Sequence, residues 1–104
     1  MTIEKKSNAM RFLEKRTGGP LSMAKLLEAT RNGEGWSQAE LAEKLGVSRS
    51  VVCDIEHGRR FVSAELAERF ALKLGKSKTQ FVRIALQDQL HRAKMHYCVD
   101  VKAA

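Results

Sequence analysis

Hydrophobic residues along most of this chain recur at intervals of three and four, which is the period of a helix that buries one face. The pattern breaks at short runs rich in glycine and serine, and these breaks separate five segments. We expect helices over residues 22–33, 38–45, 49–57, 64–74 and 78–93. These segments leave little chain for other structure, so the sequence predicts an all-α fold, a compact five-helix bundle.

Residues at the helix ends support these boundaries. A serine stands at the start of each segment, where its hydroxyl oxygen can accept a hydrogen bond from a backbone N–H that the helix leaves unpaired. Ser37 with Glu40, and Ser77 with Gln80, have the spacing of a capping box. Gly46 follows the second helix, where it can end the helix in the left-handed backbone conformation that glycine adopts without strain.

The two ends of the chain do not follow the helical period. Residues 95–101 alternate between apolar and polar side chains, which predicts a short strand with one buried face. A single strand needs a partner, which is residues 10–13, the same strand of a second subunit, or the sheet edge of another protein. A disordered tail is the alternative. Residues 1–9 are polar and charged, and we expect them to fray.

Residues 37–60 have the pattern of a helix-turn-helix, two short helices joined by a tight turn. Leu41 and Leu45 form an apolar stripe on the first helix, and Val52 and Ile55 are expected to face inward from the second. Ala42 has to be small because the second helix crosses the first closely. This device places its second helix in the major groove of DNA.

This stretch resembles the Cro and phage-repressor family, the XRE-like regulators of bacteria and phages. The resemblance covers residues 22–75 and implies that they form the family's DNA-binding domain within its compact bundle. The rest of the chain divides into an N-terminal arm over 1–21 with room for a short strand, an additional helix over 76–94 and a C-terminal strand or tail over 95–104. The matching residues are Leu26, Leu27, Arg31, Ser37, Gln38, Leu41, Ala42, Leu45, Gly46, Val47, Ser48, Ile55, Glu56, Gly58, Leu66, Ala67, Phe70, Ala71, Leu74 and Gly75.

The resemblance implies base-reading side chains at Ser48, Arg49, Ser50 and Asp54. Arg49 is the strongest candidate, because a guanidinium can bond O6 and N7 of guanine together; a phosphate contact is its alternative. Asp54 either accepts from cytosine N4 or orients Arg49, since its own charge repels phosphates.

Other residues of the motif are implied to contact phosphates. Gln38 begins the first motif helix, where the family grips a phosphate with this side chain and nearby amides. Arg59 and Arg60 follow Gly58 and are expected to reach the DNA backbone, which fixes register without reading sequence. His57 occupies a phosphate-facing position and, being mostly neutral, donates one bond at most.

Arg31 and Glu56 have a structural role in the family. The resemblance implies a largely buried ion pair between them, which ties the first helix to the reading helix and holds its angle.

The charge of the chain is consistent with an anionic partner. The formal net charge is +7 at pH 7, although residues 37–60 carry equal numbers of acidic and basic side chains. The excess lies in the tails, at +3 over residues 1–16 and +4 over residues 61–104. Flanking segments are therefore expected to add affinity for phosphates; a basic surface that only keeps the protein soluble is the alternative.

Other classes of function lack support in the sequence. There is no glycine-rich phosphate loop and no nucleophile with a positioned base, so we expect neither catalysis nor a cofactor. His91, His96 and Cys98 lack the partner ligands of a metal site. Two cysteines and no secretory leader predict a reduced, cytoplasmic setting. No apolar run approaches the length of a membrane span.

The sequence therefore predicts a DNA-binding transcriptional regulator, with repression of a palindromic operator by a homodimer as the leading interpretation. The alternative is an antitoxin, which neutralises a protein toxin and represses the operon that the two share. In that case the strand at 95–101 and the N-terminal segment would face the toxin. Restriction-controller proteins and prophage repressors fit the same pattern.

Overall fold

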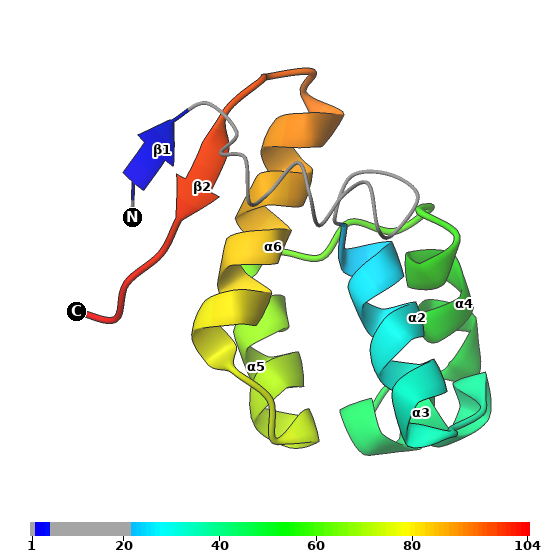
Figure 1. The fold of residues 1–104 in the computed structure, drawn as a ribbon. Coiled ribbons are helices and arrows are strands. Elements are labelled where there is room, and N and C mark those ends of the chain that lie inside the picture. The colour runs from blue at the N-terminus through cyan, green and yellow to red at the C-terminus, as the bar shows by residue number, and fades with distance from the viewer. Residues whose placement is uncertain (1, 5–21) are drawn as a thin grey trace.

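The computed structural model describes residues 2–4 and 22–104, and over these residues it has five helices and two short strands. The elements are β1 (Thr2–Glu4), α2 (Met23–Glu34), α3 (Gln38–Leu45), α4 (Arg49–Glu56), α5 (Ala64–Leu74), α6 (Lys78–Arg92) and β2 (Cys98–Asp100). Figure 1 shows α2, α3 and α4 on one side of the molecule and α5 and α6 on the other, with the strands beyond α6. The predicted all-α bundle is confirmed, and a small sheet is added to it.

The helix boundaries agree with the sequence prediction to within one residue. Each helix begins after a serine whose Oγ accepts a hydrogen bond from the backbone N–H three residues later. These serines are Ser22, Ser37, Ser48, Ser63 and Ser77. The boundaries were predictable because such caps are local features of the sequence.

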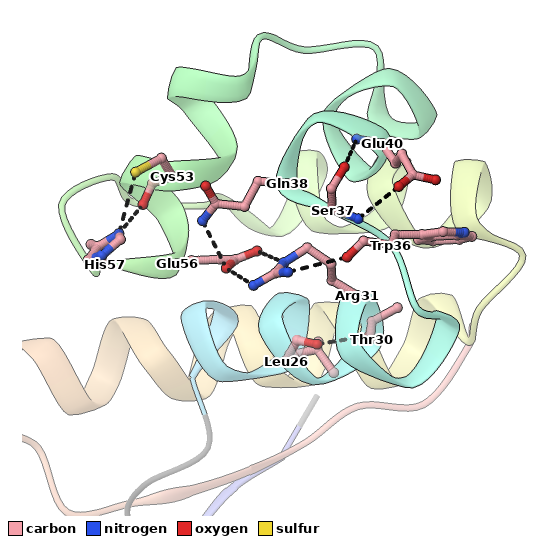
Figure 2. Close-up of polar contacts among 10 residues, drawn as sticks. All are labelled: Leu26, Thr30, Arg31, Trp36, Ser37, Gln38, Glu40, Cys53, Glu56 and His57. Carbon is pink, nitrogen blue, oxygen red and sulfur yellow. Dashed lines mark hydrogen bonds and ion pairs between the residues drawn. The ribbon is translucent and has the colours of Figure 1, made fainter.

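One of the two predicted capping boxes is complete. At α3, Ser37 Oγ accepts from the Glu40 N–H at 3.1 Å, and Glu40 Oε1 accepts from the Ser37 N–H at 3.1 Å (Figure 2). At α6, Ser77 Oγ accepts from the Gln80 N–H, but within residues 22–104 the return bond is not formed. The backbone ψ of Ser77 is 115° against 169° at Ser37, which turns the capping residue differently relative to its helix.

The core lies between the two groups of helices. Large apolar side chains from all five helices are buried in it, among them Met23, Leu27, Leu41, Leu45, Val52, Ile55, Phe70, Phe81 and Ile84. Over the described residues, none of the helices combines the length and the apolar character that a membrane span needs.

The C-terminal strand is shorter than predicted and has a different partner. Only residues 98–100 of the predicted 95–101 form β2, which pairs antiparallel with β1, Ile3 opposite Val99. Residues 2–4, which we expected to fray, supply that partner, so this expectation was wrong. The other partner proposed within the chain, residues 10–13, lies outside the described residues.

A buried glutamine of α6 holds β2 against the bundle. Gln87 Nε2 donates to the Tyr97 carbonyl at 2.7 Å, and Gln87 Oε1 accepts from the Val99 N–H at 2.9 Å. A side-chain amide carries the same donor and acceptor as a peptide group, so Gln87 bonds to the strand as a neighbouring strand would. The Val99 side chain is buried beside this contact.

Gln87→Glu should loosen β2, because a carboxylate keeps the acceptor for Val99 but loses the donor to the Tyr97 carbonyl. We expect a loss of about 1–2 kcal/mol in the free energy of unfolding and faster hydrogen exchange at the Val99 amide. Gln89→Glu, an equal change at an exposed position of the same helix, should leave both unchanged. Equal exchange at Val99 in the two variants would contradict this account.

The turn between α3 and α4 depends on a glycine and a lysine. Gly46 has φ 71°, a left-handed conformation that side chains with a Cβ adopt at a cost. Lys73 of α5 donates from Nζ to the Leu45 carbonyl at 2.9 Å, which satisfies one of the unpaired carbonyls at the end of α3. A Cβ at Gly46 would lie 3.1 Å from that Nζ.

Gly46→Ala should therefore destabilise the protein by about 1–2 kcal/mol. Gly33→Ala is the matched control, because Gly33 lies within α2, where a Cβ meets nothing within 4 Å. That change should stabilise the protein by about 0.5–1 kcal/mol. Urea denaturation of both variants measures the difference, and equal midpoints would refute the strain assigned to the turn.

Candidate nucleic-acid interface

α3, the turn at Gly46 and α4 form the predicted helix-turn-helix. The inward-facing residues predicted from the sequence are all buried between these helices and the rest of the core. They are Leu41, Ala42, Leu45, Val52 and Ile55. Because Val52 and Ile55 bury one face of α4, the helix presents its opposite face to solvent, as a helix that enters a groove must.

The outer face of α4 carries polar side chains. Arg49 and Ser50 are exposed at its N-terminal end, and Cys53 and Asp54 are half-buried one turn later. Together with Arg59, these four residues line one shallow depression. The structure thus brings three predicted base-reading residues to a single surface.

Arg31 of α2 and Glu56 of α4 form the ion pair implied by the resemblance. Arg31 Nε donates to Glu56 Oε2 at 2.9 Å and Nη2 donates to Oε1 at 3.0 Å (Figure 2). The Glu56 side chain is 4% exposed and that of Arg31 19%. The hydrogen bonds to Glu56 raise the pKa of Arg31 above its ordinary value, so the guanidinium stays charged.

The ion pair also reaches α3 and the loop before it. Arg31 Nη1 donates to the Trp36 carbonyl at 3.2 Å, and Gln38 Nε2 donates to Glu56 Oε1 at 3.3 Å. Figure 2 shows these contacts around Glu56. One network therefore joins α2, the start of α3 and the end of α4. It also engages one of the two side-chain N–H groups of Gln38, which leaves the second N–H for a phosphate.

Asp54 pairs with Arg59 and not with Arg49. Arg59 Nε donates to Asp54 Oδ1 at 3.1 Å, and Arg59 Nη2 lies 3.0 Å from the same oxygen. The prediction that Asp54 orients Arg49 is therefore wrong. The hydrogen bond to Asp54 raises the pKa of Arg59.

His57 ends α4 and bonds back to its own helix. Its Nδ1 lies 2.8 Å from the Cys53 carbonyl and 3.5 Å from Cys53 Sγ (Figure 2). Because a carbonyl only accepts, Nδ1 carries the proton. The other nitrogen, Nε2, then donates to a phosphate only when the imidazole is protonated.

Two further predicted contacts lie where DNA can reach them. Ser48 caps α4, and its Oγ accepts from the Val51 N–H at 3.3 Å, which leaves its own hydroxyl proton available. Arg60 is exposed and makes no side-chain hydrogen bond to the rest of the described chain. It is therefore free to extend toward a phosphate.

Sequence reasoning missed the position of Arg59 over α4. The sequence signal for this contact was the acidic residue five positions before Arg59, with Gly58 between them to reverse the chain.

No metal site is found among residues 2–4 and 22–104. They contain no group of three or more histidine, cysteine or acidic side chains that would hold an ion.

Comparison with known proteins supports what this geometry indicates, a helix-turn-helix that binds DNA. The helix-turn-helix family HTH_3 matches residues 27–81, more than half of the chain, and the protein belongs to this family. It is 36% identical over 66 residues to an uncharacterized HTH-type transcriptional regulator of Methanothermobacter thermautotrophicus. The aligned region covers 64% of this chain and 96% of the relative.

Two solved structures of similar fold are also described as transcriptional regulators. A hypothetical transcription factor, NHTF, from Neisseria has a TM-score of 0.53 and 30% identity, covering 67% of this chain and 79% of that one. An HTH_3 family transcriptional regulator from Vibrio cholerae has a TM-score of 0.53 and 28% identity over 65% of this chain, which spans 37% of that longer protein. The protein is thus a DNA-binding transcriptional regulator of the helix-turn-helix type and not an enzyme.

Glu56→Ala should destabilise the fold by about 3 kcal/mol, because it leaves the half-buried charge of Arg31 without its partner. Glu43→Ala, at an exposed position of α3, is the control and should change stability by less than about 0.5 kcal/mol. Thermal and urea denaturation measure both. Melting of the Glu56 variant at the wild-type temperature would contradict the stabilising role of the ion pair.

Proposed function

We propose that this regulator represses transcription by binding a roughly palindromic operator as a homodimer, with α4 in the major groove. The observation that carries the proposal is the solvent-facing surface of α4, which is polar and is held at a fixed angle by the Arg31–Glu56 pair. A rigidly held helix with a polar outer face is what direct reading of base edges requires.

In this proposal the contacts at the start of α4 read bases, and others hold phosphates. Arg49 reads a guanine, because its exposed guanidinium offers two parallel donors to O6 and N7. Ser48 and Ser50 flank it at the start of the helix. Gln38 and Arg60 hold phosphates on either side.

A dimer follows from the small number of base pairs that one short helix can read. Two copies of α4, about 34 Å apart, would read two half-sites of a palindrome and multiply their discrimination. Occupancy of a promoter is enough for repression. The proposal also places the protein in the cytoplasm, where the thiols of Cys53 and Cys98, both free in this structure, stay reduced.

The first test is an anisotropy titration against duplex DNA from upstream of its own gene, beside a scrambled duplex, at two salt concentrations. Specific, autoregulatory binding predicts tight association with the native duplex alone, retained at the higher salt. Equal binding to both duplexes that is lost with salt would mean that only phosphate charge is recognised. Sedimentation of the complex would give its protein-to-DNA ratio, two chains per palindrome.

Arg49→Ala should flatten discrimination at one base pair per half-site, by about 1–3 kcal/mol, and leave nonspecific affinity mostly intact. Arg69→Ala is the matched control, since it removes the same charge from an exposed position on α5. It should weaken binding to all duplexes slightly and equally. If the Arg49 variant behaved in the same way, Arg49 would be a phosphate contact.

A second function, that of an antitoxin, is favoured by the part of the chain beyond the family match. β1, β2 and most of α6 lie outside residues 27–81. Near β2, Met95 and Tyr97 are 44% and 43% exposed, which is apolar surface suited to a protein partner. Copurification of the chain with the product of the adjacent gene tests this function, and recovery of the chain alone would exclude that partner.

A further inference from the structure

The arginine that follows α4 turns back across the outer face of that helix. Gly58 has φ 73°, which reverses the chain, and the Arg59 N–H then donates to the Asp54 carbonyl at 2.8 Å. The Arg59 side chain runs beside Cys53 and Asp54, two residues of the outer face, and lines the same depression as Arg49 and Ser50. Arg59 thus lies over the helix face that we propose enters the groove.

The Asp54 carboxylate takes one side of the Arg59 guanidinium, and the other side meets only a weak sulfur acceptor. Its Nε and Nη2 face Asp54 Oδ1 at 3.1 and 3.0 Å, and Nη2 also lies 3.7 Å from Cys53 Sγ. Within the described residues, Nη1 makes no hydrogen bond. A guanidinium has two paired sets of donors, Nε with Nη2 and Nη1 with Nη2. The carboxylate takes the first set. In the second set, Nη2 has Cys53 Sγ, a weak acceptor, as its partner, and Nη1 has none within the described residues.

We propose that Arg59, positioned by Asp54, reads a guanine in the major groove as a second base-specific contact beside Arg49. The second set of donors, Nη1 with Nη2, matches O6 and N7 of guanine once Nη2 exchanges the weak Cys53 Sγ acceptor for a base atom. This inference rests on the proposed docking of α4 in the major groove. It changes the task of Arg59 from holding a phosphate to reading a base.

The pair also accounts for an acidic residue on a surface that faces DNA. An isolated carboxylate there would repel the phosphates. Paired with Arg59, Asp54 adds little net charge and restricts a long, flexible side chain to one direction, so less conformational entropy is lost on binding. Arg60, the next residue, has no such partner within the described chain and serves as the internal comparison.

The test is a selection from a randomised duplex library, carried out with the wild-type chain and with Arg59→Lys, Asp54→Asn and Arg60→Ala. Lysine keeps the charge but cannot offer two parallel donors. The Arg59 variant should lose preference for guanine at one position per half-site, by roughly ten-fold, and keep its affinity for unrelated DNA. The Arg60 variant should keep every base preference and bind all duplexes more weakly, with a shallower salt dependence.

Asp54→Asn separates positioning from folding, because its two expected effects have opposite signs. Removal of a negative charge should raise affinity for unrelated DNA, while discrimination at the Arg59 base pair falls. In the Arg59→Lys background, Asp54→Asn should lower discrimination no further. A residue that only supports the fold would lower the melting temperature and both affinities together.

The outcomes distinguish this inference from the proposed function. A base preference in the wild-type chain that survives Arg59→Lys unchanged, with uniformly weaker binding, would make Arg59 a phosphate contact and overturn the inference alone. A wild-type library without any base preference would overturn both the inference and sequence-specific binding. Loss of the guanine at one position only in the Arg59 and Asp54 variants supports the inference.

Discussion

The direction of the reading helix depends on a carboxylate that is almost entirely removed from water. Glu56 is 4% exposed, and such a charge is tolerated only where opposite charge and hydrogen-bond donors surround it. Arg31 supplies two donors from α2, and Gln38 supplies a third from the start of α3. Apolar packing between these helices is not directional, whereas these bonds have fixed lengths and angles. Through them, α4 keeps one orientation relative to the rest of the bundle.

This arrangement links the surface of the molecule to its interior. Gln38 lies at the start of α3, where a helix end offers free N–H groups to an anion, and its side chain bonds to the buried Glu56. The turn at Gly46 is tied in the same way to α5 through Lys73. The elements that would contact DNA are therefore held by polar bonds to helices that do not, so contact geometry is set before DNA arrives.

Local signals made most of the fold predictable from the sequence. Serine caps and helical periodicity fixed the boundaries of all five helices, and the family resemblance supplied the Arg31–Glu56 pair. The sequence did not reveal the pairing of β1 with β2, because β1 has only three residues, too few to show a period, and lies at the opposite end of the chain. The bond from Arg59 to Asp54 was missed as well, since it depends on how Gly58 turns the chain. Gln87 was missed because a polar residue gives no sign that it is buried.

The contact between Gln87 and β2 also limits how the small sheet can grow. The Tyr97 carbonyl and the Val99 N–H are two residues apart and so lie on the same edge of the strand, the edge away from β1. An unpaired edge of this kind invites strands from other molecules and, with them, aggregation. Gln87 occupies it with a side chain that belongs to the same chain. Within residues 2–4 and 22–104, the sheet is closed toward the bundle, and the outer edge of β1 is where a strand from another molecule can join.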